Sequence, residues 1–243
     1  MAVTSTGSVV TIASSANTGS QSVTVPSDAT LMIVSAGGYT AGGEATFWTT
    51  TAITLNSVQA TRIRVDASNS EQSSVLYQLA NPAIGSQTFA WDWNGTAAVT
   101  EGTTIIIRFY KDVNTTTPIR SNGGQYNATS GAATTGALSH EDGDMVVATF
   151  SHYWGTGPVT WTGATSISQP AQFNDNFNRM AEAALSGAST VTVTADENAT
   201  ESGLKAISGA VIAAAAAGGR TTKNTRAFPL GMEVGMNHRQ CNI

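Results

Sequence analysis

The sequence predicts an all-β protein: a jelly-roll-like or immunoglobulin-like β-sandwich made of two sequence-related halves, followed by an extended C-terminal arm. Three observations lead to this prediction. Apolar and polar residues alternate with a period of two along most of the chain. Short strand-like runs are separated by Gly, Pro, Asn and Ser, as in sandwiches and barrels. One order of strand-like elements also occurs twice.

The repeat is clearest at two acidic turns, each followed by a continuously apolar strand. Residues 25–34 read VPSDATLMIV, and residues 140–149 read HEDGDMVVAT. The elements that follow match in the same order: 48–55 with 159–167, 75–89 with 180–191, and 105–107 with 206–208. The spacing between matched elements drifts, which indicates that loops changed length while the strand order was kept.

The first half is predicted to contain eight strand segments: 9–12, 22–25, 31–35, 47–55, 61–65, 74–79, 86–93 and 103–110. The run 31–35 is apolar throughout, so we expect it to be central. Alternation within 86–93 places Phe89, Trp91 and Trp93 on one face.

The second half is predicted to contain five strands: 144–153, 159–162, 179–185, 190–195 and 204–213. Segment 172–184 also fits a helix, but its repeat partner favours a strand from about Arg179. The alanine run 213–217 is interpreted as a strand end before a hinge at Gly218-Gly219.

These elements predict a sandwich domain over 1–217 and a docking arm over 218–243. The halves are expected at about 8–113 and 138–217, joined by a Thr-, Asn- and Gly-rich crossover at 114–137. Because each half is short of a closed core alone, we expect both halves to contribute strands to common sheets.

The composition argues against several classes of partner. Charged residues make up 11% of the chain and the net charge is −5, so no electrostatic case for nucleic acid exists. Cys241 is the only cysteine, which rules out an intrachain disulfide. No apolar run approaches the ~20 residues of a membrane helix, and the first residues lack a signal-peptide pattern. We expect no membrane insertion, and synthesis and assembly in a cytoplasm.

No catalytic or metal-binding signature is present. His140, His152 and His238 lack metal-ligand spacing, and the sequence contains no nucleophile elbow and no phosphate-binding loop. The acidic cluster 141–144 occupies a turn position and lacks EF-hand spacing, so we interpret it as a turn rather than a calcium site. A glycosidase-like carboxylate pair stays open on spacing alone. We expect no enzyme activity and no cofactor.

The tryptophans are the best ligand candidates in the sandwich. They are Trp48, Trp91, Trp93, Trp154 and Trp161. Packing in the core or at an interface is favoured over sugar binding, because large aromatic residues dominate both environments. Tyr153 and Trp154 precede a Gly-rich loop, which makes them the candidate glycan-binding residues.

The arm differs in composition from the rest of the chain. Basic residues are concentrated in it. Its apolar residues are interpreted as having neither a helical nor a strand period, so they are expected to find their contacts on another chain. The candidate partner-binding residues are Arg226, Phe228, Leu230, Met232, Met236 and Arg239.

Three motifs resemble a known group of proteins. They are Gly143-Asp144-Met145-Val146-Val147, Val159-Thr160-Trp161, and the strand pair that begins Tyr77-Gln78-Leu79-Ala80-Asn81-Pro82-Ala83-Ile84-Gly85. Over roughly residues 20 to 213, the chain resembles β-sandwich domains of tailed-bacteriophage structural proteins and bacterial surface proteins. Segment 228–239 is similar to the terminal arms with which virion proteins bind their neighbours.

The resemblance implies assembly and attachment rather than catalysis, and it supplies no functional residues to carry over. The expected function is a virion structural protein: a capsid decoration or cement protein, or a head-fibre, tail-fibre or adaptor protein. The expected partners are other virion proteins (capsid or tail subunits) and further copies of the chain, with a trimer favoured. The alternative is a carbohydrate-binding or host-adhesion module that recognises a host surface glycan through exposed aromatic residues.

Overall fold

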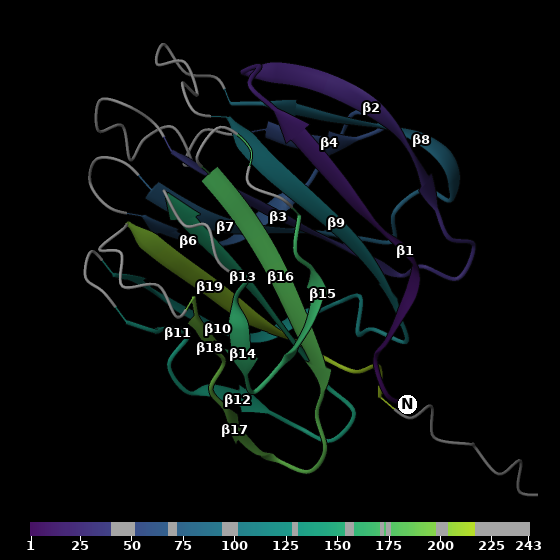
Figure 1. Ribbon diagram of the computed structural model, residues 1–243. Helices are drawn as coiled ribbons and strands as arrows, with labels where there is room; N and C mark the ends of the chain where they lie inside the picture. The colour runs from purple at the N-terminus through teal and green to yellow at the C-terminus, as the bar shows by residue number, and fades with distance from the viewer. Residues whose placement is uncertain are drawn as a thin grey trace, which may run out of the picture.

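The computed structural model describes residues 1–39, 52–67, 72–93, 102–127, 131–153, 158–170, 173, 176–197 and 204–216. Within these residues the protein is all-β and contains no helix, which confirms the predicted fold class (Figure 1). Accordingly, the described part has no helix long and apolar enough to cross a membrane. The strands form two five-stranded antiparallel sheets and three smaller sheets.

The first half builds one five-stranded sheet and one outer sheet. The five-stranded sheet has the order β1 (Thr4–Ser14), β9 (Thr103–Lys111), β3 (Leu31–Tyr39), β7 (Gln72–Ala80), β6 (Thr61–Ala67). The outer sheet has the order β2 (Thr18–Val25), β8 (Gly85–Asp92), β4 (Ala52–Leu55), β5 (Val58–Gln59). Phe89, Trp91 and Trp93 are buried in the core between these sheets, as the alternation predicts.

The second half is built in the same way, with a divided outer layer. Its five-stranded sheet has the order β10 (Ile119–Asn127), β19 (Lys205–Ile212), β13 (Met145–Tyr153), β16 (Asn176–Ala184), β15 (Thr165–Ser168). Its outer layer consists of the sheet β11 (Ala133–Thr134), β18 (Thr194–Asp196), β14 (Thr160–Thr162) and the pair β12 (Leu138–His140), β17 (Ser189–Val191).

The two five-stranded sheets have one topology. The positions of β1, β9, β3, β7 and β6 are taken in the second sheet by β10, β19, β13, β16 and β15. The repeated sequence pattern lies at matching places, since an i to i+3 turn precedes both β3 and β13. In these turns Ala29 N donates to Pro26 O at 3.2 Å, and Asp144 N donates to Glu141 O at 3.2 Å.

The halves meet face to face rather than within common sheets, so the expectation of shared sheets is wrong. Among the described strands, every ladder joins strands of one half, and the only bridge between the halves is the isolated pair Val113–Ala214. Each half closes its own core with its own outer layer. The result is four stacked β layers (Figure 1).

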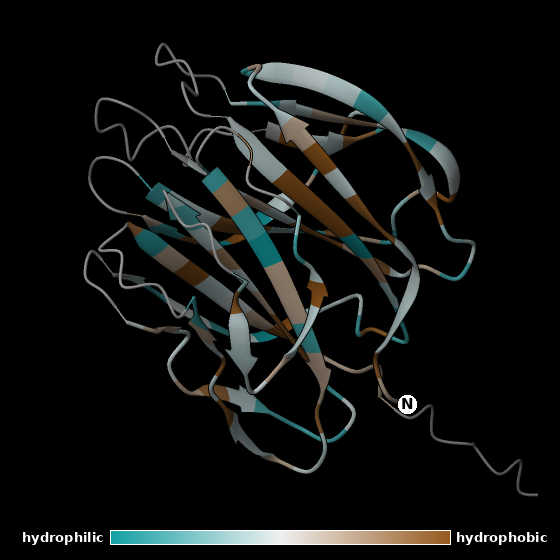
Figure 2. Ribbon diagram, viewed as in Figure 1, coloured by the Kyte–Doolittle hydropathy of each residue, from teal (hydrophilic) through white to brown (hydrophobic). Residues whose placement is uncertain are grey.

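The interface between the halves is apolar at one end and polar further along. Leu31 and Ile33 of β3 pack in one cluster with Met145, Val147 and Met180 of the second half. Further along, Asn178 of β16 donates to Ser35 Oγ at 2.6 Å and to Thr104 O at 3.1 Å. Figure 2 shows the corresponding polar stretch in the first part of β16. Buried Ser, Thr and Asn groups with partners are tolerated between sheets, because their hydrogen bonds replace those to water.

The predicted crossover at 114–137 contains two strands, β10 and β11, instead of only a connection. Its glycines gave it the composition of a loop, but they serve close packing. A Cβ at Gly124 would lie 2.3 Å from Ile207 O and 2.1 Å from Asp66 Oδ2, and one at Gly123 would lie 2.4 Å from Thr135 O. Only glycine therefore fits at these positions of the edge strand.

Two local predictions were close to the structure. Segment 176–184 is the strand β16, which begins three residues before the predicted start at Arg179. The tight turn expected near Asn56-Ser57 is present, with φ of 50° and 67°, the backbone that a two-residue hairpin requires. It joins β4 to β5, however, so the expected pairing of 47–55 with 61–65 is wrong: β6 lies in the five-stranded sheet beside β7.

Candidate functional site

The clearest candidate site is the place where the C-terminal segment leaves the sandwich. The residues after β19 are held there by the connection between the halves. Ala213 N donates to Pro118 O at 2.8 Å, and Ala215 N donates to Asp112 O at 2.8 Å. Asn114 N donates in return to Ala213 O at 2.9 Å. We call residues 213–216 the arm base.

The acidic turn before β13 also holds the arm base. Asp144 Oδ1 accepts from Ala214 N at 2.9 Å, and Asp144 Oδ2 accepts from Glu141 N at 2.8 Å. Arg120 of β10 contacts the same carboxylate, with Nε 2.5 Å from Oδ2. The predicted turn role of this cluster is therefore confirmed, and the turn also fixes the start of the arm.

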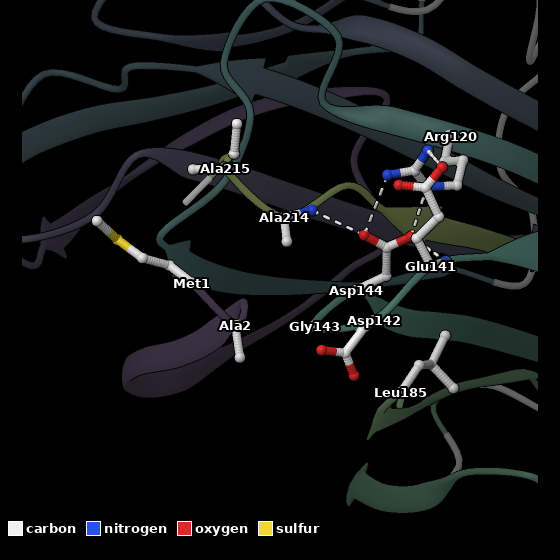
Figure 3. A pocket seen from close by; sticks show the side chains of 11 residues that line it. Met1, Ala2, Arg120, Glu141, Asp142, Gly143, Asp144, Leu185, Ala214 and Ala215 are labelled. Carbon is white, nitrogen blue, oxygen red and sulfur yellow. Dashed lines mark hydrogen bonds and ion pairs between the residues drawn. The ribbon is translucent and has the colours of Figure 1, made fainter. Parts of the chain in front are cut away.

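A pocket of about 480 Å³ lies beside these groups (Figure 3). Its lining joins the first residues of the chain, the acidic turn and the arm base: Met1, Ala2, Arg120, Glu141, Asp142, Gly143, Asp144, Leu185, Ala214, Ala215 and Ala216. Asp144 is fully buried, whereas the Glu141 side chain is 63% exposed and lies 3.0 Å from Arg120 Nη1. The pocket thus has exposed acidic groups at its edge, whereas the buried Asp144 carboxylate is neutralised by Arg120.

The surroundings of Asp144 and Arg120 favour the ionised form of both groups. Burial by itself raises the pKa of Asp144, but the hydrogen bond from Arg120 and the two backbone N–H donors outweigh it and lower that pKa. The Asp144 hydrogen bond is also the main cause that raises the pKa of Arg120. Both groups therefore stay ionised, and the turn remains locked to β10 at neutral pH.

The predicted partner-binding residues cannot be placed relative to this site. Arg226, Phe228, Leu230, Met232, Met236 and Arg239 lie outside the described residues, as does the hinge at 218–219. What the structure adds is the fixed point from which their segment begins.

The candidate glycan-binding residues are only partly described. Tyr153 ends β13, is half-buried, and its N–H donates to Leu204 O at 3.1 Å. Trp154 lies outside the described residues. Trp161 packs edge-on against Phe150, with ring centroids 6.4 Å apart, in agreement with the preferred packing role of the tryptophans.

Sequence reasoning missed a group of buried ionisable residues in the second half. His152 Nδ1 contacts Glu197 Oε2, and both side chains are fully buried. The guanidinium of Arg179 lies over the ring of Phe177, 4.0 Å from its centroid. Lys205 Nζ donates to Gly131 O at 3.3 Å. The available signals were charged residues inside predicted strands, at Arg179 in 179–185 and at Lys205 in 204–213.

Arg179 shows the main electrostatic effect within this buried group. Burial lowers the pKa of Arg179, and the nearby Glu197 carboxylate opposes that shift. Within the described ranges, no three His, Cys, Asp or Glu side chains are placed to hold a metal ion. The contact between His152 and Glu197 lies inside a core, next to the rings of Phe150 and Phe177.

No family model, curated protein or solved structure matches this chain.

Proposed function

We propose that this chain is a non-enzymatic structural protein of a tailed-bacteriophage virion, in the role of a capsid decoration, cement, fibre or adaptor protein. It binds neighbouring virion subunits through its sandwich surface and its C-terminal arm. It assembles in the host cytoplasm and forms a homo-oligomer, with a trimer favoured.

The attachment of the arm base to both halves carries this proposal. Chain ends are commonly loose unless specific contacts tie them down. Here Ala214 is bonded to the turn of the second half, and Ala215 is bonded to Asp112, which follows the last long strand of the first half. A load on the arm is therefore shared by the whole sandwich, which is what an anchoring segment needs.

The charges around the arm base support the same function. Asp28, Asp112, Glu141 and Asp142 lie near this end of the sandwich, linked through Lys111 and the acidic turn. The arm carries Arg220, Lys223, Arg226 and Arg239. Opposite charges on the two surfaces favour encounter between copies, although each exposed pair contributes at most about 1 kcal/mol and weakens with salt.

Truncation after Ala217 tests this function. The described sandwich ends before this point, so the shortened chain should fold with a nearly unchanged melting temperature. Oligomer formation, measured by sedimentation velocity, and incorporation into purified particles should both be lost. The control is the full-length chain with Thr221, Thr222 and Thr225 changed to Ser, which should assemble normally. Normal occupancy of the truncated chain in particles would show that the arm is not the anchor.

A further inference from the structure

Most edge strands of the sandwich are protected against pairing with another strand. All four edges of the five-stranded sheets contain a register shift: in β1 between Thr6 and Val10, in β6 between Arg62 and Arg64, in β10 between Ile119 and Ser121, and in β15 between Ser166 and Ser168. The interior ladders of these two sheets have none. Bulges at edges disrupt the ladder and hinder strand addition.

Strand β2 is the exception among the described edges. It pairs with β8 over all eight residues without a register shift, from Thr18↔Asp92 to Val25↔Gly85. It contains no charged residue and no proline. The other edge strands of the outer layers, β5, β11, β12, β14 and β17, have two or three residues each. The free side of β2 thus presents a long, regular row of backbone N–H and C=O groups.

A groove of about 510 Å³ runs beside this free edge, between β1 and β2. Its walls include Val10 of β1 and Gln21 and Val23 of β2, and its ends include Gly7 and Pro26. The bulge of β1 shapes the groove, because residues 7–9 fall between the paired residues Thr6 and Val10. Arg108 Nη1 donates to Gly7 O at 2.7 Å and holds the bulge in place.

The C-terminal segment has the pattern of a strand that fits such an edge. Within 228–236 five apolar residues recur at every second position, which corrects the interpretation that the arm has no strand period: Phe228, Leu230, Met232, Val234 and Met236. Strict alternation over nine residues is typical of a strand with one buried face, and its length matches the eight residues of β2. Pro229 is tolerated where its missing N–H would point away from the neighbouring strand.

We propose that residues 228–236 of one copy add as a strand to β2 of a second copy, with their apolar side chains directed into the groove between β1 and β2. This inference rests on the proposed function and names the partner of the arm. The outer sheet of each acceptor would gain a fifth strand beside β2. Backbone hydrogen bonds would supply the affinity, and the alternating apolar side chains would supply the register.

The length of the linker allows the segment to reach β2 of a second copy, and the homo-oligomer of the proposed function makes that copy the acceptor. The arm base already lies near the Pro26 end of β2, because Ala215 N contacts Asp112 O and Lys111 Nζ contacts Asp28 Oδ2 at 3.0 Å. Residues 217–227 extend to about 36–40 Å, much more than a return to the same β2 needs. A head-to-tail exchange of arms closes into a ring when the rotation between copies allows it, as in a trimer.

Disulfide cross-linking tests the pairing directly. In a Cys241→Ser background, Ser22→Cys on β2 is combined with Gly231→Cys on the arm. These positions share one face of the proposed strand pair, because Val23 and Val25 point inward on β2 and the apolar arm residues flank Gly231. Mild oxidation should give disulfide-linked dimers and higher multimers on non-reducing gels.

The matched control replaces Ser22→Cys with Asn122→Cys on β10, an exposed edge position in a bulged strand. It should cross-link weakly. A cross-link within single chains would overturn the exchange between copies, and equal cross-linking in the control would overturn the choice of β2. If truncation after Ala217 abolishes assembly but no β2 cross-link forms, the proposed function stands and this inference fails.

A second pair of variants tests the alternation without touching the sandwich. Met232→Asp places a charge on the apolar face of the segment and should weaken self-association by about tenfold to a hundredfold. Glu233→Lys changes a charge on the other face and should leave association nearly unchanged. Both are measured by sedimentation equilibrium. Equal effects of the two variants would show that the segment does not bind as a strand.

Discussion

The two halves share one five-stranded topology but differ in the layer that covers it. In the first half, β2 and β8 form one ladder of eight residue pairs. In the second half, the matching region is divided into a three-pair ladder, β12–β17, and a two-pair ladder, β11–β18. Gly136, with φ of +71°, lies between β11 and β12 and breaks the edge. A central sheet can therefore keep its strand order while its outer layer gains or loses a usable edge.

The cores beneath the outer layers of the two halves also differ in composition. The first half closes over aliphatic and aromatic side chains that include Phe89, Trp91 and Trp93. The second half packs Phe150 and Phe177 beside the buried His152–Glu197 contact. We infer that the core of the second half depends, in addition to apolar burial, on this buried polar contact, which loses more stability when one partner is removed.

The largest expected loss of stability comes from variants that remove a core side chain in one half at a time. Phe89→Ala and Phe150→Ala each remove a fully buried ring and should lower the free energy of unfolding by about 3–5 kcal/mol. Because the halves share a buried interface, we expect a single urea transition that shifts in both variants. The matched control is Ile84→Ala, an exposed apolar residue outside the strands, which should change little. Two separate transitions, each moved by one variant only, would mean that the halves unfold independently.

Variants of the two turns that precede β3 and β13 should have smaller effects on stability. Asp144→Asn removes a buried carboxylate from Arg120 and from two backbone donors and should cost about 1–3 kcal/mol. Asp28→Asn changes the matching turn, where the carboxylate is 47% exposed and accepts from Thr6 and Lys111, and should cost clearly less. Urea denaturation at pH 7 measures both.

The pH dependence of the free energy of unfolding gives a second measure of the contribution of Asp144. The pKa of Asp144 is lowered in the folded protein, so its stabilisation is complete above the ordinary carboxyl pKa of about 3.9 and is lost as pH falls through the folded value. The Asp144→Asn variant should therefore lose less stability than the wild type between pH 5 and strongly acid conditions, by roughly the neutral-pH difference between them. A parallel loss in both proteins would show that Asp144 is not coupled to folding.

The smallest effect concerns a contact between the halves. Tyr110 of β9 donates to Glu182 Oε2 of β16 at 2.7 Å, and Arg108 Nη2 lies 3.2 Å from Glu182 Oε1. Tyr110→Phe should cost about 1 kcal/mol at pH 7. Burial, reinforced by Glu182, raises the pKa of Tyr110 well above its usual range, so this tyrosine stabilises the fold fully below about pH 10 and loses that contribution as pH rises further.

The alkaline loss of stability should therefore be smaller in Tyr110→Phe than in the wild type. Urea denaturation at pH 7 and pH 11 measures it, and the difference between the two proteins removes the background from other titrating groups. The corresponding position of the second half, Ile212, pairs with Met145 as Tyr110 pairs with Leu31. An Ile212→Val variant should show no such pH dependence.

Much of the fold follows from local sequence patterns. Alternation alone placed Phe89, Trp91 and Trp93 in one core, and the acidic residues at 141–144 predicted a turn, because both depend on neighbouring residues. Strand β10 was missed because its glycines reflect close contact with residues far away in the sequence. The partition of strands between sheets and the burial of His152 against Glu197 also depend on distant residues, so no local pattern announces them.

The candidate site divides in the same way. The composition of the arm was evident from the sequence, but its fixed base was not, because that base joins Asp112, Asp144 and Ala214 only after folding. The distinction between β2 and the bulged edges likewise needed the strand register. Sequence identifies which segment has apolar residues to bury, and three-dimensional pairing identifies where they fit.

The tie between the first residues and the second half has a consequence for synthesis. Thr4 pairs with Lys111, and the buried Val3 donates its N–H to Gly143 O at 2.8 Å. At about 5–20 residues per second, Gly143 leaves the ribosome on the order of ten seconds after Val3. The hydrogen bond from Val3 to Gly143 cannot form before that time, and contacts between residues this distant in sequence slow folding. We expect the bulge and the many hydroxyl side chains of β1 to keep the nascent chain soluble until its second half has been made.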